Sequence, residues 1–245
     1  MSEAALPLTE HLAELRSRLF KIILAWGLGF AGAWSFSEII FGFLLEPATA
    51  ALGEGGKLQA IAPTEIFFTY LKCALLAGFV FALPVIFWQL WAFIAPGLYP
   101  SEKKVAVPFV LCSTVLFASG GAFGYYAVFP LVYEFFAGFS SSFVESAWTM
   151  REVFSLTTRL LLAFGTGFEL PVVVFFLAAA GIVDPRQFIG GLKYAVLVSF
   201  VFAAVLTPPD VVSQILLAVP LVVLYLVGVG VAYLFAPRRE DSDPE

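Results

Sequence analysis

Histidine, cysteine and charge are scarce in this sequence, and each scarcity excludes a class of function. His11 is the only histidine, so a metal site built from several histidines is excluded. Cys73 and Cys112 lie in separate apolar runs without a CxxC motif, which predicts two buried small hydrophobic side chains. Charged residues make up only 13% of the chain, and no basic patch with interleaved aromatic residues supports nucleic-acid binding.

Apolar residues are abundant instead. They make up 61% of the 245 residues, phenylalanine alone occurs 28 times, and the mean hydropathy is +0.96. Soluble domains are about 45–50% apolar, and one core of this size cannot hide so much apolar surface. The composition therefore predicts an all-α integral membrane protein whose solvent is mostly lipid.

Six apolar segments predict six transmembrane helices, of which the last two are short or kinked. The fifth segment has 13 residues and reaches only about 20 Å as a helix, against a hydrocarbon core of about 30 Å. Pro220 interrupts the sixth. The spans are predicted at about 19–40, 67–94, 105–129, 158–180, 194–206 and 211–235, after an N-terminal amphipathic segment (1–18) and before a charged tail (236–245).

Two long loops are predicted on the same side of the membrane, at 41–65 and 131–157. Pro47, Gly53–Gly56 and Pro63 punctuate the first loop and suggest an interfacial segment.

The basic residues predict the orientation of the chain. Lys57 and Arg151 are the only two in the long loops, whereas nine lie on the opposite side: Arg16, Arg18, Lys21, Lys103, Lys104, Arg186, Lys193, Arg238 and Arg239. Basic residues concentrate on the cytoplasmic side, so both termini are predicted to be cytoplasmic. Three acidic residues precede the first basic one, and we therefore expect no cleavable signal peptide.

Glu169 is the most informative single residue, because it falls inside the fourth predicted span. A carboxylate at this depth costs about 2.5–3.5 kcal/mol and marks either a functional site or a neutral, structurally bonded side chain. Gln89 and Gln214 are further polar residues within spans, and either is a candidate structural hydrogen-bond partner. One carboxyl group does not make a proton relay, which argues against a pump.

Catalytic motifs are absent from the sequence. It contains no GxSxG, HExxH or P-loop motif and no pair of intramembrane aspartates, so we expect neither an enzyme nor a cofactor.

Two predicted cytoplasmic segments carry acids among basic residues. His11–Phe20 is amphipathic at helical spacing, and Glu14 and Arg18 form an i,i+4 pair. Glu102 opens a second helix start at Ser101–Lys104. On pattern alone, the first is more typical of an ordinary juxtamembrane helix with a solvated charged face.

Five segments, in order along the chain, resemble the TatC family of the twin-arginine protein translocase. They are HLAELRSR at His11–Arg18, PVIFWQLWAFIAPGLYPSEKK at Pro84–Lys104, FGYYAVFP at Phe123–Pro130, AFGTGFELPV at Ala163–Val172 and LTPPDVVSQILLAVP at Leu206–Pro220. The basic turn that relatives carry before the fifth span is reduced here to Lys193, which weakens the expectation that this turn contributes to partner binding.

The resemblance implies a cup-shaped six-helix bundle that binds twin-arginine signal peptides at its cytoplasmic face. It assigns that binding to Glu14 and Glu102, with Arg16 and Phe93 in the same region. It further implies a function for Pro47 and Asp210 in the outer loops. With the intramembrane position of Gln214, it assigns Glu169 and Gln214 to contact with a partner helix.

The predicted function is therefore the core subunit of the twin-arginine translocation complex in the inner (cytoplasmic) membrane. The expected partners are TatA-like and TatB-like single-span proteins, signal peptides of folded cargo, the lipid bilayer and further copies of the chain, with export driven by the proton-motive force. Two alternatives stay open: a proton-coupled secondary transporter using Glu169, and a passive scaffold.

Overall fold

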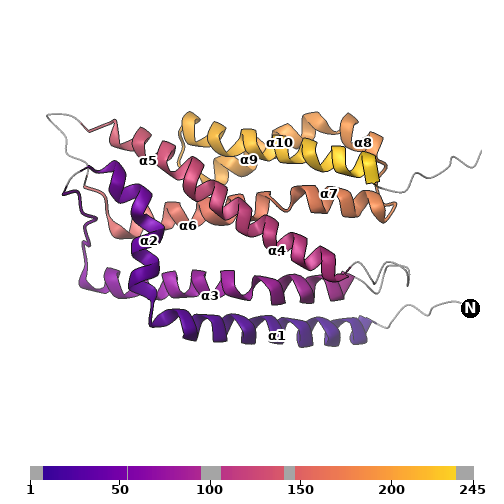
Figure 1. Cartoon of the computed structure of the whole chain (residues 1–245), viewed down its shortest axis with the longest axis horizontal. Coiled ribbons are helices and arrows are strands. Elements are labelled where there is room, and N and C mark those ends of the chain that lie inside the picture. Colours follow the sequence, from indigo (N-terminus) through magenta and orange to yellow (C-terminus); the bar gives the residue numbers. More distant parts are fainter. Residues whose placement is uncertain (1–7, 54, 95–105, 141–146, 236–245) are drawn as a thin grey trace, which may run out of the picture. The chain divides into compact units, whose positions relative to one another are not determined.

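The computed structural model describes residues 8–53, 55–94, 106–140 and 147–235, and the regular elements within these ranges are all helices (Figure 1). The elements are α1 (Leu8–Trp34), α2 (Ser37–Ala51), α3 (Pro63–Ile94), α4 (Ala106–Phe123), the π-helical turn η3 (Gly124–Val128), α5 (Phe129–Ala137), α6 (Met150–Gly167), α7 (Leu170–Ala179), α8 (Pro185–Gly190), α9 (Leu192–Leu206) and α10 (Val211–Phe235). The predicted all-α class is confirmed. Within the described ranges the chain forms two units, one from 1–45 and 59–115 and the other from 46–58 and 116–245.

Long apolar helices dominate both units. Four are long and apolar enough to cross a membrane: Pro63–Phe93, Val107–Ala137, Met150–Ala179 and Val211–Phe235. Leu12–Trp34 and Ser37–Ala51 pass the same test as a bent pair. The fifth and sixth predicted spans coincide with α9 and α10 to within two residues, and α10 continues through Pro220 as one helix.

The first predicted span requires a correction. It was placed at 19–40, whereas α1 ends at Trp34 and the chain turns by 88° into α2. The predicted irregular loop from 41 therefore begins as a helix that runs to Ala51 and contains Pro47. Pro47 lacks the N–H that would bond the carbonyl of Phe43. The helix nevertheless continues through it, because in an apolar environment the other backbone groups are more stable when they are hydrogen-bonded within a helix.

The second predicted loop, 131–157, also requires a correction. Helix α5 continues to Ala137, and α6 begins at Met150, so both helices extend well beyond the apolar segments. Thr149 supplies the N-cap of α6, because its side chain accepts a hydrogen bond from the Glu152 backbone N–H at 3.3 Å. The hydropathy of the sequence indicates where the apolar environment ends, whereas the Thr149 cap determines where α6 begins.

In the first unit, α1 and α3 lie side by side (Figure 1). Gly29 and Gly78 face each other, and a Cβ on Gly29 would lie 2.7 Å from the Gly78 carbonyl oxygen. Small residues at such a contact let two membrane helices approach closely. Trp26 supports the contact, because its indole N–H donates to the Leu75 carbonyl at 2.8 Å.

The second unit packs around fully buried side chains of α5, α6 and α10. Phe129, Phe164 and Leu217 are completely shielded. Tyr133 is also buried, and its hydroxyl group is hydrogen-bonded to Thr157 and to the Val153 carbonyl. Helix α10 packs against both α7 and α9.

Large apolar side chains remain exposed along most helices, as lipid contact requires. Phe81 is 70% exposed and Leu234 is 78% exposed. Cys73 is buried as predicted, but Cys112 is exposed, which corrects the expectation of two buried cysteines. An apolar thiol on a lipid-facing surface carries no desolvation cost, so sequence hydropathy alone does not distinguish the two positions.

Candidate functional site

The N-terminal half of α1 carries the predicted acid–arginine pair. The Arg18 guanidinium donates to Oε1 of Glu14 through Nε, at 3.0 Å, and through Nη2. The Arg18 side chain is 19% exposed and that of Glu14 is 28% exposed. The predicted i,i+4 pair is confirmed, and it fixes the Glu14 carboxylate on one face of the helix. Arg16 is exposed on the same segment.

The end of α3 carries the predicted aromatic residue of the same region. Phe93 is half-buried in the last turn. Trp91, two residues earlier, is buried and stacks on Phe109 of α4 with ring centroids 4.3 Å apart. Glu102, the second predicted acid, lies outside the described residues.

Glu169 lies at a break between two helices. Gly167 ends α6, Leu170 begins α7, and Glu169 is the N-cap residue of α7. Its side chain is half-buried, and its Oε1 atom is shielded from solvent. The predicted fourth span, 158–180, therefore contains two helices with the carboxyl group at their junction.

The cause of this break is Pro171. Proline has no N–H for the carbonyl of Gly167, and its ring clashes with that carbonyl in a continuous helix. The backbone tightens instead, as the Glu169 N–H bonds the Thr166 carbonyl at 3.1 Å. The proline in Glu169-Leu170-Pro171 indicates a helix break in the sequence, but hydropathy alone does not detect it.

Asp210 and Gln214 meet at the start of α10. The Asp210 carboxylate accepts a hydrogen bond from the Ser213 N–H at 2.7 Å, which makes Asp210 the N-cap of the helix. The Gln214 side-chain amide donates to the Phe200 carbonyl of α9 at 3.2 Å. Both residues thus stabilise the α9–α10 turn, and Gln214 has the structural role that the sequence left open as an alternative.

Pro47 lies in the part of α2 that belongs to the second unit, next to Glu46. The Tyr125 hydroxyl donates to the Glu46 carboxylate at 3.3 Å, which links α2 to η3. A π-helical turn is uncommon and often lies near functional positions. This pair was not predictable from local sequence patterns, because 79 residues separate its members.

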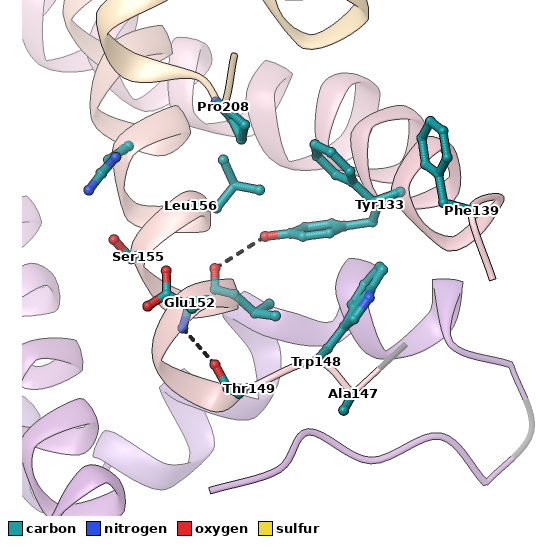
Figure 2. A pocket seen from close by; sticks show the side chains of 12 residues that line it. Tyr133, Phe139, Ala147, Trp148, Thr149, Glu152, Ser155, Leu156 and Pro208 are labelled. Atoms are coloured by element: carbon teal, nitrogen blue, oxygen red, sulfur yellow. Dashed lines mark hydrogen bonds between the residues drawn. The ribbon is translucent and has the colours of Figure 1, made fainter. Parts of the chain in front are cut away.

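A cavity of about 700 Å³ lies between α5, α6 and the α9–α10 turn (Figure 2). Tyr133, Phe139 and Trp148 lie on one side, Glu152 and Ser155 of α6 on the other, and Pro208 closes one end. Arg159 also lines it. Apolar patterning does not predict this cavity, because its walls come from segments that are distant in the sequence.

The predicted site residues fall into two groups. Glu14, Arg16 and Phe93 belong to the first unit, whereas Pro47, Glu169, Asp210 and Gln214 belong to the second. Of these, the structure brings Asp210 and Gln214 into contact. Among the described residues, no three acidic, histidine or cysteine side chains are grouped as metal ligands would be.

Apolar helices of membrane-spanning length, one of them broken at a half-buried glutamate, define a multi-pass membrane protein. The model of the family "Sec-independent protein translocase protein (TatC)" matches residues 10–220. The chain belongs to the TatC family of protein translocase components.

Relatives support this assignment over nearly the whole chain. The TatC protein of Desulforapulum autotrophicum is 45% identical over 98% of this chain and 88% of its own length. That of Magnetococcus marinus is 44% identical over 93% of this chain and 84% of its own length. A crystal structure of the twin-arginine translocase receptor TatC superposes with a TM-score of 0.82 at 36% identity, covering 91% of this chain and 98% of that one. Translocase components of this family carry a transport role rather than a catalytic one.

Proposed function

We propose that this chain is the receptor and core subunit of a twin-arginine translocase. The observation that carries the proposal is its likeness, over 91% of its length, to a protein described as the twin-arginine translocase receptor. The chain would bind twin-arginine signal peptides at its cytoplasmic face and recruit TatA-like and TatB-like single-span proteins. Further copies would join the complex, and the proton-motive force would drive export of folded cargo across the inner membrane.

Glu14 and Glu102 would hold the two arginines of the signal peptide. Guanidinium binds carboxylate through two parallel, charge-assisted hydrogen bonds, which lysine does not match. Arg18 bonds only Oε1 of Glu14 in the described contacts, and a carboxylate has about four lone-pair sites. Glu14 can therefore accept a second guanidinium while Arg18 keeps its orientation. Arg16 and Phe93 would line the same region.

Glu169 would contact the partner helix inside the membrane. It lies ten residues before Ala179, about 15 Å along the helix axis and therefore near the middle of a hydrocarbon core of about 30 Å. The break at Pro171 leaves backbone groups near the carboxyl group without a continuous helix around them. Gln214 would offer a second polar contact, in addition to its bond to Phe200.

A proton-coupled transporter remains the second candidate, because one observation favours it. Broken helices with a polar residue at the break are typical of substrate and ion sites in secondary transporters. Solute uptake into vesicles that contain only this chain would support this second candidate.

Crosslinking of a twin-arginine peptide to the purified full chain tests the proposal. Photoreactive groups on the peptide are expected to label the segments around Glu14 and Phe93. Labels confined to the opposite ends of the helices, near Ser37 or Met150, would contradict the proposed binding face.

A further inference from the structure

The cavity between α5, α6 and the α9–α10 turn lies at the depth of lipid headgroups. Arg159 precedes the end of α7 at Ala179 by 20 residues, which corresponds to about 30 Å and thus to a full hydrocarbon core. Arg159 therefore marks the boundary on the side where α6 begins. The first nine residues of α6 rise about 13 Å farther, through the headgroup layer.

The short α9 leaves this space open. It ends at Leu206 after 15 residues, about 22 Å, so the turn that follows it does not reach the level of the α6 N-terminus. Pro208 of this turn and Arg159 line the same cavity. The space between Pro208 and the N-terminus of α6 is bounded by α5 and α6 and lies where phosphate and amine groups of the bilayer are found.

One face of α6 presents both charges to the cavity. Glu152 and Arg159 are seven residues apart, which places them on the same side of the helix about 10 Å apart along its axis. Side chains on a helix lean toward its N-terminus, so the guanidinium reaches toward Glu152. The only described ionic neighbour of Glu152 is Arg151 at 3.9 Å, a weak, exposed contact.

Aromatic side chains form the facing wall (Figure 2). Tyr133 is held rigid by its hydrogen bond to the Val153 carbonyl, and Trp148 lies against it with ring centroids 5.7 Å apart. Phe139 is 67% exposed beside them. Phe139 and the half-buried Trp148 carry the accessible aromatic faces of this wall, because Tyr133 is buried behind them, and such faces attract ammonium groups.

We propose that this cavity binds the zwitterionic headgroup of a phospholipid. Arg159 binds the phosphate at the hydrocarbon boundary, and the amine extends outward between Glu152 and the aromatic wall. Along α6, Glu152 lies farther from the hydrocarbon core than Arg159. In a lipid of that leaflet the amine likewise lies farther out than the phosphate, so each headgroup charge meets a side chain of opposite charge. A headgroup without an amine leaves Glu152 unsatisfied and binds less well.

Native mass spectrometry of the purified full chain in detergent tests this site. The probes are short-chain phosphatidylethanolamine, short-chain phosphatidylglycerol and inorganic phosphate. Arg159→Ala is expected to weaken phosphatidylethanolamine binding about tenfold, the loss of one charge-assisted contact, and Arg159→Lys to retain most of it. Glu152→Gln is expected to reduce the preference for phosphatidylethanolamine over phosphatidylglycerol.

Lys72→Ala is the matched control. Lys72 is also exposed and precedes the end of its helix, Ile94, by 22 residues, about 33 Å, so it lies at a similar depth but does not line this cavity. Its variant is expected to bind the lipid within twofold of the parent. Equal losses in the two variants, equal affinity for the two lipids, or competition by inorganic phosphate at the same concentration would overturn the proposal. So would a photocrosslinker at position 139 that captures a single-span protein and no phospholipid in membranes.

Discussion

Single glycines set the distances between helices. Gly228 of α10 is buried, and a Cβ there would lie 2.7 Å from the Pro171 Cα, whereas Gly230 two residues later is exposed and has open space around it. Gly228→Ala is therefore expected to destabilise the protein by about 1–3 kcal/mol through overpacking. Gly230→Ala is expected to be neutral or slightly stabilising, because alanine favours the helix. Thermal unfolding in detergent compares them, and equal melting temperatures would contradict the close α7–α10 contact.

Variants of Glu169 test whether assembly with a partner helix is separable from receptor binding. If it contacts a partner helix, Glu169→Ala is expected to reduce partner recruitment and export while signal-peptide crosslinking persists. Interhelical hydrogen bonds in membranes contribute about 0.6 kcal/mol, with about 1.7 at the upper end, so the variant should remain folded. Glu169→Gln is expected to fall between Ala and the parent, since the amide keeps the shape and still donates and accepts hydrogen bonds.

The readout for Glu169 is export activity measured beside peptide crosslinking in the same variant. Loss of both together would mean that Glu169 stabilises the fold or the receptor site. A silent Gln variant with a fully exporting Ala variant would leave the carboxyl group without a role in transport.

Among the elements, the N-cap of α10 combines a structural and a predicted functional role in Asp210. Its carboxylate bonds the Ser213 N–H, so Asp210→Ala is expected to destabilise α10 by about 0.5–2 kcal/mol. Asp210→Asn keeps the cap and removes the charge. If Asp210 acts only as a cap, the Asn variant should export normally and melt like the parent. Export lost in a stable Asn variant would instead assign a function to the charge.

The shortness of α9 makes a second prediction for an element. Its 15 residues span about 22 Å, less than a normal hydrocarbon core. Local thinning of the bilayer, or shielding by a partner helix, is the expected response. Accessibility labelling of cysteines at positions 194 and 207 is expected to find both near water. Labelling that places them a full bilayer thickness apart would contradict thinning.

Elements differ in how far the sequence predicted them. Composition alone was sufficient for the helical class, and α9 and α10 follow their apolar segments closely. Most of α2 and the start of α6 lie in segments that were interpreted as loops, because Pro47 in the first and Arg151 and Glu152 in the second interrupt the apolar pattern while backbone bonding continues. The helix break was predictable from Pro171, but an interpretation based on hydropathy gave this proline no weight. The Glu46–Tyr125 hydrogen bond depends on tertiary packing and was not predictable from the sequence.

At the scale of the whole molecule, the proposed receptor role requires recognition of an arginine pair at the end where α1 begins. The Glu14–Arg18 pair was predictable from helical spacing, whereas Glu102 lies outside the described residues and its place in the site remains a prediction. Family membership follows from the match over residues 10–220.

Measuring the affinity of a twin-arginine signal peptide for the purified full chain tests this receptor role. Replacing Arg-Arg by Lys-Lys in the peptide, or Glu14 and Glu102 together by Ala in the chain, is expected to weaken binding at least tenfold, since a charge-assisted hydrogen bond contributes about 1.5–3 kcal/mol. The matched control replaces Glu38 and Glu134, two exposed acids assigned to the opposite side, by Ala and is expected to bind normally. Unchanged affinity for the Lys-Lys peptide, or in the Glu14 and Glu102 double variant, would contradict the receptor assignment.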